Sequence, residues 1–395
     1  MKVGFLLGKE HETLPYSELN ALLEIYDIDK NLSIFDNYVV LDKLDDDNSD
    51  NDKDNKNNNI SKAEYMETIN NIESITKRSA YINESHLILF EMLYVDKDLQ
   101  KNINMFYKNL IDLPLDNILN IDISKDTFAV RALKVPKEIK QKEDKNEKNI
   151  IKNTKDIKDI KKPNSMDIER EVGRIIKEKT GAKVNLKNPS KVVKVIILKD
   201  RIYLALLIEK RDKEYFQKNR PHLRAYFHPG CILPKLARCM VNLARLKEGD
   251  ILLDPFCGTG GFLIEGGFIG CKLIGSDIDD RMVEGTLLNL KSYNLMDNII
   301  SIKKWDAKYI KDYLNTLKIK EVDGIITDPP YGISTSKKGD IESILNSLGN
   351  VLKDNGYMVF ASSKKVYLED LRLMDMYEIY IHKSLTRYVH VYKKE

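Results

Sequence analysis

The chain has 395 residues and a mass of 45.7 kDa, enough for two or three domains at roughly 100–200 residues per domain. Hydrophobic residues make up 42% and charged residues 32%, which allows a sizeable core and excludes disorder throughout. The formal net charge of +3, taken alone, argues against a nucleic-acid partner. The sequence has no CxxC or HxxxH spacing and no apolar stretch of about 18 residues, so we expect no metal site, membrane segment or signal peptide.

The first 122 residues predict a small α+β unit. We expect its elements at residues 3–7 (strand), 17–26 (helix), 34–41 (strand) and 73–92 (helix). Ser17 and Asn20 suggest a capped start for the first helix. Residues 45–59 contain no apolar side chain, so we interpret them as an insert that does not fold.

The middle of the chain predicts a second unit with a strong positive charge. We expect strands at 127–135, 192–198 and 202–209, the last two forming a tight hairpin, and a helix between Asp167 and Gly181. Residues 137–162 are rich in Lys, Glu, Asp and Asn and predict a second insert, with a solvated single helix as the alternative. Residues 123–220 carry 28 basic and 15 acidic side chains, which favours a polyanionic partner.

From about residue 221 strands and helices alternate. We expect strands at residues 250–256, 272–279, 299–306, 322–330 and 357–363, and an antiparallel pair at 376–382 and 386–394. Buried strands with intervening helices predict a doubly wound parallel sheet of Rossmann type. Ligands of such sheets bind beyond the carboxyl ends of the strands.

The first of these strands ends in the sequence DPFCGTGG, which begins at Asp254. Glycines at a strand-to-helix turn let a ligand approach the backbone. Phe262-Leu263 follow where a P-loop needs Lys-Ser/Thr, and the third glycine of a dinucleotide fingerprint is missing, so both sites are excluded. Asp254 before the turn suits a ligand with a cationic amino-acid end, such as S-adenosylmethionine.

The next two strands also end in acidic residues. Asp277 follows the second strand, where a carboxylate can accept both ribose hydroxyls, and Asp306 follows the third, where it could accept from an adenine amino group. An aspartate at one strand end commonly caps the next helix, but three at successive strand ends predict a cofactor site.

The fourth strand ends in Asp328-Pro329-Pro330-Tyr331-Gly332. The two prolines fix the backbone and remove two donors. The Asp328 carboxylate and the Pro329 carbonyl can then accept both hydrogens of an exocyclic amine, while the base stacks on Tyr331. We expect methyl transfer to that amine, with no covalent nucleophile such as Cys257.

DPFCGTGG, GSDID and DPPYG in this order resemble the class I S-adenosylmethionine-dependent amino-methyltransferases that act on nucleic acids. The HPGCILPKLAR stretch from His228 and the NLAR stretch from Asn242 are similar to the helix that precedes this fold in tRNA guanine-N2 methyltransferases. In the first half, FAVRALKV (128–135), the helix at 168–179 and VNLKNP (184–189) resemble a THUMP RNA-binding domain, and the opening LLGKEHETLPYSELNALLE resembles the ferredoxin-like domain before it. The resemblance is greatest to the archaeal enzymes that make N2-methyl- and N2,N2-dimethylguanosine at position 10 of tRNA.

This resemblance implies a ferredoxin-like domain at 1–75, a THUMP domain at 76–212, a linker at 213–220 and a methyltransferase domain at 221–395. It implies a cytoplasmic monomer that binds tRNA and uses S-adenosyl-L-methionine without a metal. The residues expected to hold the target amine are Asp328, Pro329, Pro330 and Tyr331. Those expected to hold the cofactor are Asp254, Phe256, Gly258, Thr259, Gly260, Asp277, Ile278, Asp306, Ala307 and Asp328.

Three alternatives remain open on the sequence. The guanine could lie elsewhere in tRNA or in ribosomal RNA, since the pocket would be much the same. The enzyme could instead methylate adenine N6 or cytosine N4 in DNA. The basic N-terminal half discriminates the two, because in a tRNA enzyme it should bind tRNA much better than duplex DNA at matched salt. A non-catalytic RNA-binding protein with a vestigial fold is the third.

Overall fold

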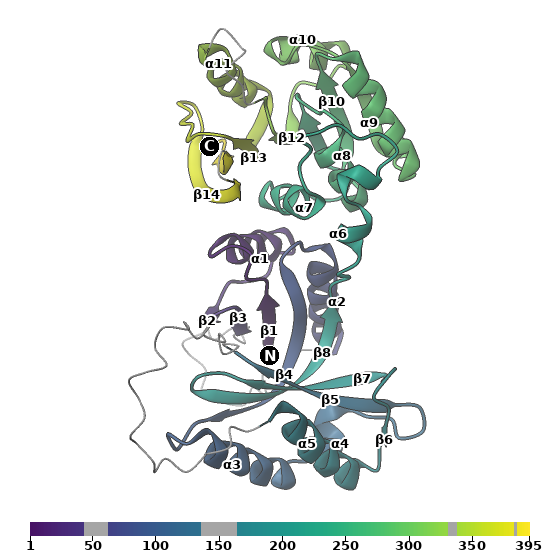
Figure 1. Cartoon of the computed structure of the whole chain (residues 1–395), viewed down its shortest axis with the longest axis vertical. Coiled ribbons are helices and arrows are strands. Elements are labelled where there is room, and N and C mark those ends of the chain that lie inside the picture. The colour runs from purple at the N-terminus through teal and green to yellow at the C-terminus, as the bar shows by residue number, and fades with distance from the viewer. Residues whose placement is uncertain (43–61, 136–163, 331–337, 383–384) are drawn as a thin grey trace, which may run out of the picture. The chain divides into compact units, whose positions relative to one another are not determined.

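The computed structural model describes residues 1–42, 62–135, 164–330, 338–382 and 385–395 (Figure 1). The inserts predicted at 45–59 and 137–162 lie outside the described residues. The chain divides into two compact units. The eight-stranded unit comprises Met1–Leu7, Lys30–Glu73 and Asn83–Lys210, and the seven-stranded unit comprises Gly8–Asp29, Ser74–Ile82 and Arg211–Glu395.

The eight-stranded unit is one mixed sheet with helices on a face. The strands, in spatial order, are β2 (Leu32–Phe35), β3 (Tyr38–Asp42), β1 (Lys2–Leu7), β4 (Ile82–Leu93), β8 (Arg201–Lys210), β7 (Lys191–Ile197), β5 (Thr127–Lys134) and β6 (Lys183–Val184). Helices α3 (Leu99–Asp112), α4 (Leu115–Leu119) and α5 (Ser165–Thr180) cover one face of β4, β5, β7 and β8 (Figure 1). Their apolar side chains close a single core over these strands, with Phe106, Phe128 and Val172 all nearly inaccessible to solvent.

Several predicted elements of this unit are confirmed and others are wrong. The helix before Gly181 is confirmed: Asn164 caps its start through the Met166 N–H, and Gly181 ends it at φ +69°. The helix predicted at 73–92 is wrong, because α2 (Lys62–Arg78) ends early and residues 82–93 form β4, antiparallel to β8. The strand predicted at 34–41 is a hairpin, with β2 and β3 joined by a turn at Asp36 and Asn37.

The first helix, α1 (Leu14–Ile25), begins three residues before the predicted start at Ser17. The ring Nδ1 of His11 accepts hydrogen bonds from the backbone N–H groups of Thr13 and Leu14, each at 3.1 Å. An imidazole therefore satisfies two backbone donors at the start of this helix, ahead of the start that the sequence suggested at Ser17.

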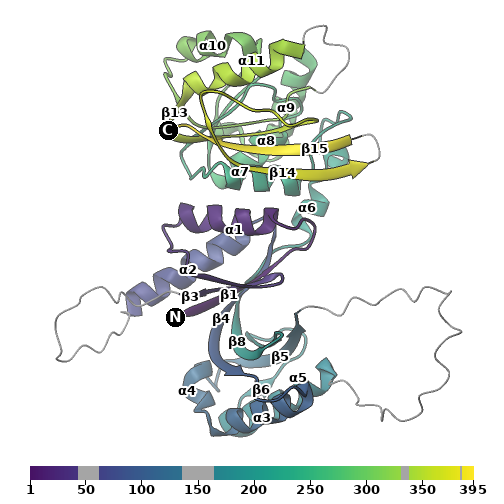
Figure 2. The same cartoon turned by 90° about the vertical axis from the view of Figure 1, so that its left-hand side faces the viewer.

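The seven-stranded unit has the predicted doubly wound architecture. Its strands, in spatial order, are β11 (Ile299–Lys304), β10 (Lys272–Asp277), β9 (Ile251–Asp254), β12 (Val322–Thr327), β13 (Leu352–Ser362), β15 (Leu385–Lys393) and β14 (Arg372–His382). The first five are parallel, and the C-terminal hairpin, seen in yellow in Figure 2, is antiparallel as predicted. Since β9 lies between β10 and β12, the strand order reverses at β9 and β12, where a sheet of this type binds ligands.

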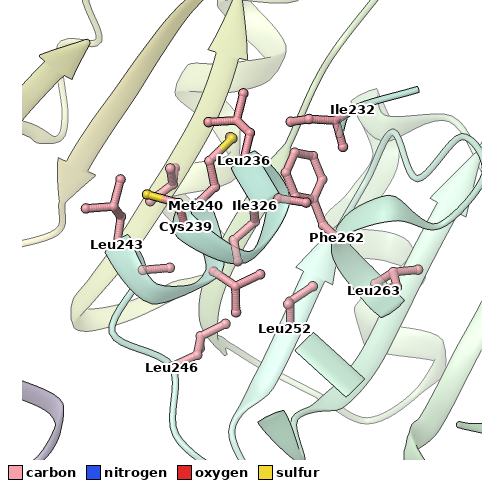
Figure 3. Packing of buried hydrophobic residues seen from close by; sticks show 14 of the residues in the cluster. Ile232, Leu236, Cys239, Met240, Leu243, Leu246, Leu252, Phe262, Leu263 and Ile326 are labelled. Carbon is pink, nitrogen blue, oxygen red and sulfur yellow. The ribbon is translucent and has the colours of Figure 1, made fainter. Parts of the chain in front are cut away.

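Helices cover both faces of this sheet. They are α6 (Tyr215–Lys218), α7 (Pro234–Leu243), α8 (Gly261–Ile269), α9 (Asp280–Ser292), α10 (Ile310–Thr316) and α11 (Lys338–Leu348), with short 3-10 turns η1 (Pro221–Leu223), η2 (Met296–Asn298), η3 (Ala307–Tyr309) and η4 (Gly349–Val351). Residues 213–220, expected to be a linker, contain α6, and its Phe216 is buried in the core of this unit. Figure 3 shows side chains of α7 gathered with Leu252 of β9, Ile326 of β12 and Phe262 of α8.

Polar contacts attach α1 and the segment 78–81 to α7 within this unit. The buried Glu18 carboxylate accepts hydrogen bonds from the backbone N–H groups of Ala80 and Tyr81 and from the Asn242 amide, all at 2.7 Å. Arg78 Nε donates to Asn242 Oδ1 at 2.9 Å, and Arg245 pairs with Glu24 at 2.8 Å. The sequence NLAR thus binds elements from the first 82 residues of the chain.

Candidate active site

The turn after β9 depends on its glycines. Gly258 and Gly260 have φ values of +52° and +79°, in the left-handed region that side chains disfavour. A Cβ atom on Gly260 would also lie 2.9 Å from Thr286 Cγ2 of α9. The backbone therefore comes close to α9 while α8 begins at Gly261.

Asp254 lies beneath this turn and is only 1% exposed. Its Oδ1 accepts from Thr327 Oγ1 at 2.8 Å and from the Phe256 N–H at 3.2 Å, so it ties β9 to β12 and orders the turn. Burial raises the pKa of Asp254 to about 8. The hydrogen bonds from Thr327 and from the Phe256 N–H lower this pKa, and the charges of Asp277 and Asp328 raise it by smaller amounts. A cation placed beside Asp254 would favour its ionised form.

The carboxylates after β10 and β11 differ in their surroundings. Asp277 is partly buried; its Oδ2 accepts from the Gly258 N–H at 2.9 Å and its Oδ1 from the Asp279 N–H at 3.0 Å. Asp306 is exposed, and its Oδ1 caps η3 by accepting from the Lys308 N–H at 3.0 Å. Each oxygen keeps a second lone pair for a ligand.

Asp328 follows the end of β12, and only one of its two carboxylate oxygens has a partner among the described residues. Its Oδ2 lies 3.1 Å from Arg387 Nη2 of β15, and both side chains are largely buried. Its Oδ1 is also buried and has no hydrogen-bond partner among the described residues. Burial raises the pKa of Asp328 to about 6, while the Arg387 guanidinium acts in the opposite direction.

One cavity of about 660 Å³ collects these residues at the carboxyl edge of the sheet. The predicted residues that line it are Asp254, Phe256, Gly258, Thr259, Asp277, Ile278, Asp306, Ala307, Asp328 and Pro330. Gly260 and Pro329 do not line it, and Tyr331 lies outside the described residues. The cavity therefore unites carboxylates from four strand ends, and its surroundings favour a ligand that carries positive charge and several donors.

The cavity also has walls that the sequence did not identify. They come from the loop His228–Ile232 before α7, from Met282 of α9, from Trp305, and from Ile341 and Ile344 of α11. The buried Asn289 holds the loop: it accepts from the Tyr226 N–H at 2.8 Å and donates to the carbonyls of Tyr226 and Thr259 at 3.0 and 2.9 Å. The HPG stretch was a signal for the loop, whereas nothing in the sequence singled out Asn289 or Arg387.

Among the residues that the structure describes, no group of three or more His, Cys, Asp or Glu side chains could hold a metal ion. No helix in these described ranges is long and apolar enough to span a bilayer.

Comparisons with known proteins agree with this geometry. Residues 221–384 match the family described as RMKL-like, methyltransferase domain, and residues 101–207 match the THUMP domain. Over its full length the chain has the fold of TrmN from Thermus thermophilus, whose crystal structure superposes with a TM-score of 0.52 at 16% identity and 100% coverage of both chains. These findings confirm the predicted fold class and the predicted THUMP and methyltransferase parts.

Two archaeal relatives match at higher identity. The probable tRNA (guanine(10)-N2)-dimethyltransferase of Methanothermococcus thermolithotrophicus is 75% identical over 40% of this chain and 98% of its own length. The tRNA (guanine(10)-N2)-dimethyltransferase of Methanocaldococcus jannaschii is 49% identical over 99% of both chains. The chain therefore belongs to the family of tRNA (guanine(10)-N2)-dimethyltransferases, and it is a methyltransferase.

Proposed function

We propose that this enzyme transfers methyl groups from S-adenosyl-L-methionine to the exocyclic N2 amine of a guanosine in tRNA. The names of its relatives place the guanosine at position 10 and describe a dimethyltransferase. The observation that carries the proposal is that one cavity joins the carboxylates at the ends of β9, β10 and β11 to Asp328 of β12. The first three carboxylates can bind the cofactor, and Asp328 can accept a hydrogen bond from the target amine.

The cavity fits the cofactor on chemical grounds. Asp254 lies where it can meet an ammonium group, and the raised pKa that burial gives it would fall when that cation arrives. Asp277 has lone pairs for the two ribose hydroxyls, and Asp306 for an adenine amine, beside the apolar surface of Ile278 and Ala307. When bound, the cofactor supplies an activated methyl group on a sulfonium, so the protein needs no nucleophile of its own.

The chain's part in the reaction is to bind and orient the amine. Asp328 Oδ1 is a buried acceptor that the described residues leave open. A guanine N2 hydrogen donated to it turns the nitrogen lone pair towards the cofactor side of the cavity. Pro329 O as the second acceptor and Tyr331 as the stacking surface remain predictions. Such alignment can supply roughly 7–11 kcal/mol of the barrier reduction.

The substrate must be held by more than the pocket. A base in a helical stem has to leave the stack to reach such a cavity, which costs a few kcal/mol. We assign tRNA binding to the THUMP-matched region 101–207, which overlaps the stretch 123–220 with its 28 basic and 15 acidic side chains. We also propose that the enzyme acts as a monomer in the cytoplasm.

The test is methyl transfer from labelled cofactor to unmodified tRNA, followed by mass spectrometry of the digested product. We expect N2-methyl- and N2,N2-dimethylguanosine at position 10. Label on a guanine at another tRNA position, or on a guanine of ribosomal RNA, would show that the enzyme methylates a different guanosine from the one at position 10. Label on adenine N6 or cytosine N4, or better binding of duplex DNA than of tRNA at matched salt, would refute the proposal.

The Asp328→Ala variant sharpens this test. It should lose transfer at least 100-fold, the order of effect seen when one positioned polar group is removed from an active site. Its affinity for the cofactor, measured by calorimetry, should remain within about threefold of the wild type. Equal losses of transfer and affinity would place Asp328 in the cofactor site instead.

A further inference from the structure

The two oxygens of Asp328 are treated differently by the protein. Oδ2 is engaged by the Arg387 guanidinium at 3.1 Å, and Oδ1 has no partner among the described residues. Asp328 lines the cavity, whereas Arg387 does not. The arginine therefore approaches the carboxylate from behind and leaves its other oxygen towards the ligand.

The strand arrangement explains how Arg387 reaches this place from 59 positions further along the chain. Side chains alternate between the two faces of a sheet. Val389 and Val391 of β15 lie in the same core cluster as Ile326 of β12, so the pattern places Arg387 and Asp328 on that face as well. The β13–β15 ladder ends with Ser362 opposite Tyr388, so Arg387 lies just past the last paired residue of β13.

Among the described residues, Arg387 of β15 is the charged group that attracts the Asp328 carboxylate. Asp254 of β9 is a second carboxyl group close enough for the Asp328 charge to raise its pKa. Without the arginine, a buried carboxylate beside a second carboxyl group would take up a proton readily. A protonated Asp328 could present an O–H donor to the amine, and the amine needs an acceptor.

We infer that Arg387 is the positioning residue of the methyl-acceptor site: it fixes Oδ2 of Asp328 so that Oδ1 is presented to the guanine amine as an acceptor. This inference rests on the proposed function. It also assigns a role in the transition state, where positive charge grows on the amine nitrogen and an ionised Asp328 stabilises it. Arg387 itself touches neither cofactor nor base in this assignment.

The test compares Arg387→Met, which removes the charge at similar length, with Arg387→Lys, which keeps it. Single-turnover methylation of unmodified tRNA by the full chain is measured from about pH 5.5 to about pH 9. We expect Arg387→Met to move the acid limb of the rate profile upwards by about one pH unit or more. Its rate should then fall about tenfold below the wild type at pH 6 and recover to within about threefold at pH 9.

Two further variants complete the design. Arg387→Lys should keep the wild-type acid limb with a lower plateau, because an ammonium preserves the charge without the planar fork. Arg372→Met is the matched control: Arg372 is an exposed arginine of β14 that pairs with Glu395, and its loss should leave the profile unchanged. A rate for Arg387→Met that is reduced by one constant factor at every pH would overturn the inference, since that is the result of a purely structural role.

The inference can fail separately from the proposed function. The identity of the methylated base decides the function, while the position of the acid limb decides the role of Arg387 on whichever base is methylated. A ¹³C-carboxyl NMR titration measures the pH at which Asp328 ionises without relying on catalysis. The Asp328 signal is assigned by its loss in Asp328→Asn, and its titration is compared between the wild type and Arg387→Met. An Asp328 titration that is unchanged in Arg387→Met would also overturn the inference.

Discussion

Asp254 is a buried carboxyl group whose charge is costly in the folded chain. Its pKa of about 8 lies far above the ordinary value of 3.8, chiefly because of burial. At a pH below the ordinary value the group is protonated in both the folded and the unfolded chain. Between about pH 4 and pH 8 only the unfolded chain ionises, so the free energy of unfolding falls as the pH rises.

We therefore predict that Asp254→Asn removes this pH dependence. The amide keeps an acceptor oxygen for Thr327 and the Phe256 N–H, and it does not titrate. Thermal unfolding is measured without cofactor. Between about pH 4 and pH 8, the free energy of unfolding of the variant should rise relative to that of the wild type by up to ~1.4 kcal/mol per pH unit. Asp306→Asn, at an exposed carboxylate, serves as the control, and parallel curves for Asp254→Asn and the wild type would contradict the prediction.

The sequence predicted four candidate site residues from their positions at strand ends. Asp254, Asp277, Asp306 and Asp328 follow four strands whose carboxyl ends meet at one edge, and all four line the cavity. Arg387 could not be identified, because its contact depends on the order of β13 and β15 in the sheet. Asn289 escaped notice because an asparagine within an amphipathic helix carries no local signal.

Among the elements, α7 has a role beyond covering the sheet. Its Asn242 shares hydrogen bonds with Glu18 of α1 and with Arg78 of α2, while the loop that precedes it lines the cavity. The N-terminal segments 8–29 and 74–82 are therefore part of the unit that carries the site.

We predict that Glu18→Ala destabilises the chain by ~2–4 kcal/mol. Its removal leaves the buried N–H groups of Ala80 and Tyr81 and the Asn242 amide without their acceptor, and each unsatisfied group costs ~1–3 kcal/mol. Thermal or urea unfolding measures the effect. Glu12→Ala, at an exposed carboxylate nearby, should change the free energy of unfolding by less than ~0.5 kcal/mol. A Glu18→Ala variant as stable as Glu12→Ala would show that these bonds contribute little.

Element prediction succeeded where the pattern was local and failed where the partner was distant. The helix before Gly181 has both of its caps in sequence, and the strands of the parallel sheet are apolar runs bounded by turns. Residues 82–93 were predicted as part of a helix, yet they form β4, because β8 supplies their backbone partners from more than 100 residues away. Helices α3 and α4 had no prediction at all.

For the whole molecule, the net charge of +3 is the sum of unequal parts. The basic stretch 123–220 contains 18 basic residues outside the insert at 137–162, so the insert does not account for the charge. The exposed lysines Lys183 and Lys187 follow α5 in the THUMP-matched region, beside the exposed apolar side chains of Val184 and Leu186. This combination of cations and apolar surface is what an RNA-binding face requires.

The last prediction concerns how those charges act on tRNA affinity. The double variant Lys183→Gln, Lys187→Gln should weaken tRNA binding and reduce the slope of log affinity against log salt by up to ~0.9 per lysine that contacts a phosphate. The matched control is Lys318→Gln, Lys320→Gln: both are exposed and lie just before β12, at the amino end of the sheet whose carboxyl end holds the site. Binding is measured at several salt concentrations with unmodified tRNA. Equal slopes for the two double variants would show that the field of the whole chain, rather than the THUMP-matched region, attracts the tRNA.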